Sequence, residues 1–192
     1  MPILILLLLL SVTSTAAWPD DTHHGVQVDV SRKGNRYTLN ATIDTSLKEC
    51  AAYHYLTDYR SARDLPGVIK SSAYRESANK VRVDRIADEH VLFFYVRLHS
   101  VMEYTEQPFD RIAFTQLSGD SKVFQGSWEI VPNQQGSTLR FSGVWEPDSL
   151  IPLFIIDHFA KSGLIEKFEA IARLAEKRKA GLSDSCINLA AK

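Results

Sequence analysis

The chain has 192 residues, of which 45% are hydrophobic and 23% are charged, which is typical of one globular domain with a sizeable core. Its formal net charge of -1 gives no electrostatic reason to expect nucleic acid or an anionic membrane surface as a partner. The sequence also lacks a dinucleotide fingerprint, a phosphate-binding glycine loop, a Gly-x-Ser-x-Gly elbow and a Cys-x-x-Cys pair, so it does not indicate the enzyme classes that use them.

Residues 1–17 have the pattern of a secretion signal peptide. An unbroken apolar run from Ile3 to Leu10 is followed by small residues that end at Ala17. The run is shorter than the ~20 residues that a membrane-spanning helix needs. No Lys or Arg precedes it, so an uncleaved anchor or a misassigned start is the alternative. We therefore expect an exported protein, periplasmic or secreted, with its domain at residues 18–180 and a flexible tail at 181–192.

The first part of the domain combines strand and helix patterns. Residues 26–43 alternate between apolar and polar side chains on either side of a turn, which predicts an extended segment or a hairpin. Ser46 lies three residues before Glu49, the spacing of a capping box, and predicts a helix from Leu47 to about Tyr59. A second short helix is expected at residues 60–64, before the sequence Leu-Pro-Gly.

The two cysteines leave two possibilities open. Cys50 lies in the first predicted helix and Cys186 lies in the tail, and the pair could form one disulfide in an oxidising compartment. Alternatively, Cys50 is a buried thiol on the helix beside two alanines, and Cys186 is unrelated to it. The sequence alone does not decide between these possibilities.

The middle of the chain is predicted to form strands. They are expected at about residues 68–76, 80–87, 91–105 and 109–117, followed by a hairpin of residues 122–132 and 138–145. The segment 91–105 is long for one strand, so a bulge or a strong bend is expected within it. Sequential strands joined by short turns usually pair antiparallel, so we predict one antiparallel sheet of about 6–7 strands in an α+β domain.

A long helix is predicted after Pro147, and its two halves differ. The half from Leu164 to Lys179 is amphipathic, whereas Leu150–Leu164 is apolar almost all round, and Gly163 is a weak point between the halves. An apolar segment of this kind must be buried on several sides, cover a cavity or touch a membrane. The helix is expected to end at Ala180-Gly181.

Four segments together resemble a known superfamily: Tyr59–Val68, Gly126–Pro132, Gly136–Phe141 and the closing helix. They are similar to the START-like helix-grip (SRPBCC) superfamily, in its branch of polyketide cyclase/dehydrase and coenzyme-Q-binding proteins, over residues 26–179. The resemblance implies a helix-grip fold, in which a curved antiparallel sheet wraps around a long C-terminal helix, with two short helices after the first strand. It also implies an elongated apolar cavity between sheet and helix. Members hold lipids, sterols, quinones or polyketides, and a minority act on them, but the export signal separates this chain from the cytosolic and mitochondrial quinone-binding members.

The predicted inward faces of the sheet and the apolar half of the helix supply the candidate ligand-binding residues. Their aromatic content favours a cavity, because ligand sites are mostly apolar with few polar groups. Gly126 and Gly143 are expected to leave space among the larger side chains, and a filled core is the alternative. The candidate lining residues are Phe94, Leu98, Met102, Tyr104, Phe114, Phe124, Gly126, Trp128, Phe141, Gly143, Trp145, Phe154 and His158.

Polar candidates for chemistry are few. His158 follows Asp157 on the apolar half-helix and could face a cavity. Arg97, His99 and Glu103 share one strand face, and a surface ladder is favoured over a pocket cluster because the other face of that strand is more uniformly apolar. No third ligand accompanies the His-Glu pair at a telling spacing, so we expect no catalytic residue, no metal site and no cofactor.

These observations and the resemblance predict an exported binding or carrier protein for a hydrophobic, lipid-like ligand, such as a lipid, quinone, isoprenoid or polyketide. One alternative is a cyclase or dehydratase that acts on a hydrophobic substrate in the same cavity, with Tyr, His or Arg as acid or base. A second alternative is an envelope scaffold protein without a ligand. We expect a hydrophobic small molecule or lipid as partner, a monomer, and transient membrane contact through residues 150–164.

Overall fold

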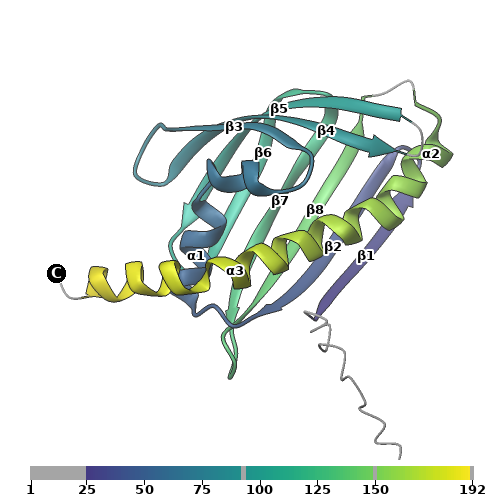
Figure 1. The fold of residues 1–192 in the computed structure, drawn as a ribbon. Coiled ribbons are helices and arrows are strands. Elements are labelled where there is room, and N and C mark those ends of the chain that lie inside the picture. The colour runs from purple at the N-terminus through teal and green to yellow at the C-terminus, as the bar shows by residue number, and fades with distance from the viewer. Residues whose placement is uncertain (1–24, 92–93, 149–150, 191–192) are drawn as a thin grey trace, which may run out of the picture.

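The computed structural model describes residues 25–91, 94–148 and 151–190, which form one sheet and a long C-terminal helix (Figure 1). The strands are β1 (Val26–Lys33), β2 (Arg36–Thr45), β3 (Val68–Arg75), β4 (Lys80–Val91), β5 (Phe94–Gln107), β6 (Arg111–Gly119), β7 (Ser121–Pro132) and β8 (Ser137–Pro147). The helices are α1 (Glu49–Thr57), the 3-10 helix η1 (Ser61–Asp64), α2 (Leu153–His158), the π-helical turn η2 (Phe159–Gly163) and α3 (Leu164–Ala190).

All eight described strands belong to one antiparallel sheet in the order β1-β2-β8-β7-β6-β5-β4-β3. The sheet is curved, and Figure 1 shows α3 lying across it while β3, β4 and β5 curl over at the far edge. The predicted α+β helix-grip architecture is therefore confirmed in outline. The predicted strand count is too low and the two short helices follow the second strand, because residues 26–45 form a complete hairpin, β1 and β2.

The hairpin of β1 and β2 shows how the sequence fixes the register. Gly34, with φ 63°, occupies the first central position of the two-residue turn between Lys33 and Arg36, a conformation that glycine adopts without steric cost. A one-residue slip would turn every side chain of β2 to the opposite face. The native register instead buries its alternating apolar side chains, which are at most 4% exposed: Tyr37, Leu39, Ala41 and Ile43.

The expected irregularity in the long fifth strand is also present. The pairing of β5 with β6 shifts register between Val101 and Met102, as a β-bulge does. Gly119, with φ 138°, lies opposite Ser100 at the end of this ladder, where an added Cβ would lie 2.3 Å from the carbonyl oxygen of His99. A bulge bends its strand and increases the local twist, which agrees with the way β3, β4 and β5 curl over in Figure 1.

The helix α3 packs on the sheet through small side chains in its middle. Ala172 and Ala175 are fully buried and Phe168 is 5% exposed, and all three belong to the same core cluster as Ile43 and Leu139 of the sheet. Alanine lets the helix approach the sheet closely, while Phe168 fills the wider gap. The sheet and α3 therefore share one hydrophobic core.

The helix α3 continues past Gly181 to Ala190, so the predicted helix end at Ala180-Gly181 is wrong. Glycine within a helix costs about 1 kcal/mol relative to alanine. Contacts beyond it offset this cost: Leu182 is buried in the main core, and Cys186 forms a disulfide with Cys50 of α1 at a Cα–Cα distance of 6.1 Å. The disulfide answers the question that the sequence left open.

The predicted capping box of α1 is wrong. The helix begins at Glu49, its N-cap residue is Lys48, and no side chain caps it. Ser46 instead bonds to Glu176 of α3, which accepts hydrogen bonds from the backbone N–H of Ser46 at 2.7 Å and from its hydroxyl. The serine therefore joins the start of α1 to the long helix.

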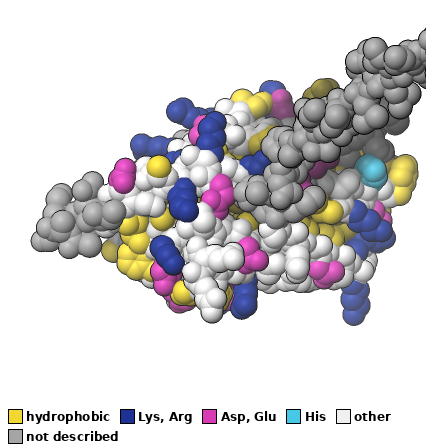
Figure 2. Space-filling view, turned by 60° about the horizontal axis from the view of Figure 1, so that its bottom comes forward, with side chains coloured by type: hydrophobic (Ala, Val, Ile, Leu, Met, Phe, Trp, Pro, Cys, Tyr) yellow, Lys and Arg dark blue, Asp and Glu magenta, His cyan; other side chains and the backbone are white. Residues whose placement is uncertain are grey.

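The surface has charges of both signs. Figure 2 shows Lys and Arg side chains interspersed with Asp and Glu on one face, and exposed hydrophobic side chains beside a histidine at the end of the molecule that carries α2. Within the described ranges, no helix has a stretch long and apolar enough to cross a membrane. The predicted signal peptide, residues 1–17, lies outside the described residues.

Candidate ligand-binding cavity

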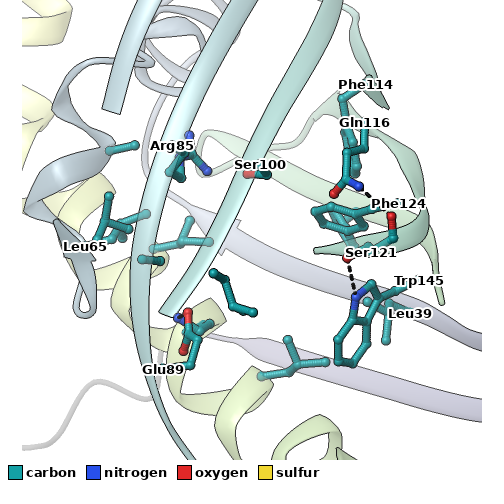
Figure 3. A pocket seen from close by; sticks show the side chains of 18 of the residues that line it. Leu39, Leu65, Arg85, Glu89, Ser100, Phe114, Gln116, Ser121, Phe124 and Trp145 are labelled. Atoms are coloured by element: carbon teal, nitrogen blue, oxygen red, sulfur yellow. Dashed lines mark hydrogen bonds and ion pairs between the residues drawn. The ribbon is translucent and has the colours of Figure 1, made fainter. Parts of the chain in front are cut away.

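A cavity of about 530 Å³ lies between the concave face of the sheet and the helices. Strands β2 to β8 contribute to one wall, while α1, the η1 region, α2, η2 and α3 form the other. Small-molecule sites in proteins typically enclose about 300–1,000 Å³ and are lined mainly by apolar and aromatic side chains. The cavity therefore has the size and the lining of a ligand site (Figure 3).

Aromatic rings from β6, β7 and β8 form a continuous layer on the sheet side. The rings of Phe114 and Phe141 stack with centroids 5.8 Å apart, and Trp128 and Phe168 lie 5.0 and 5.3 Å from Phe141. Phe124 contacts Phe114 at 5.1 Å. Because inward positions alternate along each strand, the four strand residues project their rings from one face of the sheet, and Phe168 meets them from α3.

A pair of glycines lies within this aromatic layer. Gly126 of β7 pairs with Gly143 of β8, between two aromatic cross-strand pairs. A Cβ at Gly126 would lie 2.3 Å from the carbonyl oxygen of Ser142, and a Cβ at Gly143 would lie 3.0 Å from the ring of Phe141. Neither glycine lines the cavity. The space that the missing side chains leave is occupied by the backbone of β8 at Gly126 and by the Phe141 ring at Gly143. The two glycines therefore do not widen the cavity, whereas we expected from the sequence that they would leave space in it.

Two hydrogen bonds join Trp145 and Gln116 to Ser121 at the aromatic end of the cavity. The indole Nε1 of Trp145 donates to Ser121 Oγ at 3.0 Å, and Gln116 Nε2 donates to the carbonyl oxygen of Ser121 at 2.7 Å (Figure 3). These bonds fix the orientation of Trp145 and satisfy its N–H within an apolar wall. This end of the cavity therefore offers mainly aromatic surface to a ligand.

Two cavity-lining charges pair across the walls. Glu89 of β4 is 9% exposed, and its Oε1 lies 2.7 Å from Lys167 Nζ on α3. A buried carboxylate needs such a partner, because burial without one costs several kcal/mol. The pair therefore neutralises its own charges and connects the helix to the curled edge of the sheet.

Arg85 also lines the cavity, and no such partner for it is found in the described part of the chain. It lies on β4 four residues before Glu89, beside Ser100 of β5 (Figure 3). Its Nε is buried and has no hydrogen-bond partner, and no ion pair joins its guanidinium to a residue in the described ranges. Guanidinium groups stay protonated in proteins and prefer carboxylate, phosphate or carbonyl oxygens. Arg85 therefore offers a place for an oxygen-bearing group in an otherwise apolar cavity.

A second polar cluster lies beside the cavity, around the 3% exposed Glu106 of β5. Its carboxylate accepts hydrogen bonds from Tyr59 at 2.9 Å, Tyr53 at 3.2 Å and Arg75 at 2.9 Å. Burial, then the charge of Glu106, raises the pKa of Tyr53 to about 12 and that of Tyr59 further. Both phenols stay neutral near pH 7, and the cluster attaches α1 and its C-terminal loop to the sheet.

The structure brings seven of the predicted candidates to the cavity: Leu98, Tyr104, Phe114, Phe124, Trp128, Phe141 and Trp145. Met102 is 3% exposed but lies in the core outside the lining. Phe154 is 69% exposed and His158 is also exposed, so both face away from the cavity. The side chain of Phe94 lies outside the described part of the chain.

The remaining polar candidates have other roles. Asp157 accepts hydrogen bonds from Tyr37 and Arg32 at 2.8 Å, so it fastens α2 to the β1–β2 hairpin. Arg97 and His99 are exposed at the cavity rim and lie 2.7 and 3.0 Å from carboxylates of the neighbouring strand β4. With these contacts they form the surface ladder that the sequence favoured.

Sequence reasoning missed Arg85, Glu89 and Lys167. Val81 and Val83 of β4 are buried, so the strand alternation directs residues 85, 87 and 89 inward as well. Charged side chains are unusual at inward positions of a strand, so Arg85 and Glu89 could have been identified as candidate cavity residues from the sequence. The pairing of Glu89 with Lys167 depends on how α3 lies on the sheet and has no local signal.

Comparisons with known proteins agree with this architecture. Residues 46–167, more than half of the chain, match the model of the family "Polyketide cyclase / dehydrase and lipid transport". No curated protein matches the chain.

Solved structures share the fold at low sequence identity. A STAR-related lipid transfer protein from Xanthomonas axonopodis has a TM-score of 0.67 at 13% identity, over 79% of this chain and 93% of that chain. The Zhui aromatase/cyclase from Streptomyces sp. R1128 has a TM-score of 0.63 at 15% identity, over 74% of this chain and 95% of that chain. A protein from Thermus thermophilus has a TM-score of 0.65 at 16% identity, over 76% of this chain and 99% of that chain. The chain belongs to the polyketide cyclase/dehydrase and lipid transport family.

Proposed function

We propose that this protein binds and carries a lipid-like molecule with a long or fused apolar body and one acidic or carbonyl oxygen group. The observation that carries the proposal is an aromatic cavity of about 530 Å³ lined by Arg85, whose buried Nε has no hydrogen-bond partner among the described residues. The apolar body would lie along the Phe114–Phe141 layer, and the oxygen group would accept hydrogen bonds from Arg85.

Two free-energy terms of this arrangement favour binding. Burial of about 300 Å² of apolar ligand surface contributes ~7 kcal/mol at ~25 cal/mol per Å², before the cost of association is subtracted. A charge-assisted hydrogen bond to the guanidinium of Arg85 adds about 1.5–3 kcal/mol. Affinity would therefore come mainly from the aromatic wall, and selectivity for an acidic group would come from Arg85.

The family description and the aromatase/cyclase neighbour keep a cyclase or dehydratase as the second candidate. In such an enzyme Arg85 would polarise a substrate carbonyl. The carrier is the better supported reading, because Glu89, the buried carboxylate of the cavity, already pairs with Lys167. A general base has to lie within hydrogen-bond reach of the substrate proton, and the ion pair holds this carboxylate against Lys167 of α3.

Carriage outside the cytoplasm is part of the proposal. The Cys50–Cys186 disulfide supports it, because such bonds persist mainly in oxidising compartments. The signal-like residues 1–17 support it independently. We further propose that the protein works as a monomer and that α2 touches the membrane during ligand exchange, since Phe154 is 69% exposed there.

A pair of ligands tests the role of Arg85. A fluorescent fatty acid and its methyl ester share the apolar body and differ in charge. The wild type is expected to bind both, and Arg85→Met is expected to lose roughly ten-fold or more in affinity for the acid while binding the ester as before. Arg63→Met, at an exposed arginine of η1, is the matched control. Failure of the wild type to bind either probe would contradict the carrier, and equal loss of both in Arg85→Met would contradict the anchoring role.

A further inference from the structure

Three potential metal ligands meet between α1 and α3, at the disulfide. Cys50 and His54 are four residues apart on α1 and therefore share one helix face. Cys186 approaches them from α3. One ligand atom from each of the three residues lies within 4.8 Å of the other two. Two elements distant in sequence thus supply two sulfurs and an imidazole to one point.

The imidazole of His54 shows a second, independent feature. Its Nε2 is buried and has no hydrogen-bond partner in the described part of the chain. A buried polar atom without a partner costs about 1–3 kcal/mol, so such atoms are rare in native proteins. Coordination to a metal ion is one way in which an imidazole nitrogen is satisfied.

We propose that Cys50, His54 and Cys186 form a metal site for Zn²⁺ when the disulfide is reduced. A dithiol reductant would supply two electrons and two protons, converting the disulfide to two thiols while its own two thiols become a disulfide. Zn²⁺ would then displace the two thiol protons and bind two thiolates and one imidazole nitrogen, with the fourth position open to water. This Cys₂His set with an open position is an established zinc geometry.

The dimensions and surroundings suit such a site. Zn–S distances of about 2.3 Å and Zn–N distances of about 2.0–2.1 Å in a tetrahedron separate the ligand atoms by roughly 3.5–3.8 Å. The three present ligand atoms already lie within 4.8 Å of one another, so small side-chain movements would suffice. A groove of about 590 Å³ borders His54 between the end of α1 and α3, lined also by Thr57, Asp58 and Leu182, and gives solvent a route to the site.

The site would replace one cross-link by another. In both states α1 and the C-terminal part of α3 are joined at Cys50 and Cys186, by the disulfide when oxidised and by the metal when reduced. The site lies apart from the ligand cavity, because none of its three residues lines that cavity. Its existence is therefore independent of the proposed carrier function.

Cobalt titration of the full chain tests the proposal. Reduced wild type with Co²⁺ is expected to show sulfur-to-cobalt charge transfer in the near ultraviolet and the visible bands of tetrahedral cobalt, both saturating at equimolar metal and both abolished by Zn²⁺. His54→Gln is expected to weaken Co²⁺ binding more than about ten-fold, because one of three ligands is lost. His158→Gln, at an exposed histidine of α2, is the control and should titrate like the wild type.

The oxidised protein should show no thiolate charge transfer, which separates this site from binding by other histidines. Absence of charge transfer in the reduced wild type, or an unchanged affinity in His54→Gln, would overturn the proposal. If reduction unfolds the chain, Zn²⁺ should restore its circular dichroism in the wild type and in His158→Gln but not in His54→Gln. Failure of Zn²⁺ to restore the wild type would overturn the proposal in that case as well.

Discussion

Lys167 on helix α3 lies 2.7 Å from Glu89 on strand β4, and both residues line the cavity. The side chain of Glu89 is 11% exposed and that of Lys167 is 31% exposed, so solvent screens the pair only in part. Loss of the lysine would leave a nearly buried carboxylate without its partner. The ion pair therefore stabilises the packing of α3 on the sheet more than an exposed ion pair would.

Lys167→Met should lower the free energy of unfolding by about 1–3 kcal/mol, because the stem is retained while the charge that pairs with Glu89 is lost. Urea unfolding measures this. In the double variant with Glu89→Gln, the loss should be smaller than the sum of the two single losses. Additive losses would mean that the two side chains do not interact.

Leu98→Trp should block the cavity, because Leu98 lines it and a larger side chain there occupies ligand space. We expect loss of binding of an apolar fluorescent probe, with circular dichroism like that of the wild type. Leu117→Trp makes the same change at a 49% exposed position of β6 that is not part of the cavity lining, and should bind the probe normally. Normal binding by a folded Leu98→Trp protein would place the ligand elsewhere.

The contact between Tyr37 and Asp157 should make stability depend on pH at both extremes. The hydrogen bond from Tyr37, opposed by desolvation and helped by Arg32, lowers the pKa of Asp157. Its stabilising contribution is therefore present above the unfolded pKa of about 3.9 and lost as the pH falls through the lower folded pKa. Burial, then the bond to Asp157, raises the pKa of Tyr37 to about 12. Its contribution is present below the unfolded pKa of about 10 and lost as the pH rises toward 12.

Urea unfolding across pH separates the two groups. Asp157→Asn should be less stable than the wild type at neutral pH and should lose less stability below about pH 4. Tyr37→Phe should lose less stability than the wild type between about pH 10 and 12. Asp148→Asn changes a side chain that is 64% exposed and should follow the wild-type curve. If the wild type and Asp157→Asn lost the same free energy of unfolding below about pH 4, folding would not lower the pKa of this carboxylate.

Phe154→Asp should weaken binding to phosphatidylcholine vesicles by roughly ten-fold or more, because insertion of one phenylalanine is worth about 1.5–3 kcal/mol. The ring is 69% exposed on α2, so its replacement should leave the fold intact. Ile69→Asp, at a 54% exposed position of β3, is the control. Vesicle sedimentation with equal binding by both variants and the wild type would contradict membrane contact through α2.

The periodicity of the sequence was sufficient for the architecture. Alternation placed Phe114, Phe124, Trp128, Phe141 and Trp145 on one face, and the structure brings all five to the cavity. The apolar half-helix was harder to interpret, because it is apolar on all sides. The structure buries Ile155 and Ile156 and exposes Phe154, a choice that depends on how α2 lies on the sheet.

Features that depend on tertiary contacts were beyond sequence reasoning. The sequence shows that Gly126 has no side chain, but it does not show whether the space beside it is empty. In the structure the backbone of β8 fills that space. Gly181 is a helix-ending signal, yet α3 continues past it, because the disulfide at Cys186 and the burial of Leu182 stabilise the following helical turns. Local propensity is a weak prior that such contacts routinely outweigh.

Native mass spectrometry of the protein, purified from the envelope or medium of its own host, tests the central claim most directly. We expect one lipophilic molecule with an acidic or carbonyl group per wild-type chain, released by solvent extraction and absent from Leu98→Trp. The bare chain mass from both proteins, together with no binding of an apolar probe by the wild type, would contradict the carrier and indicate that the cavity has no ligand.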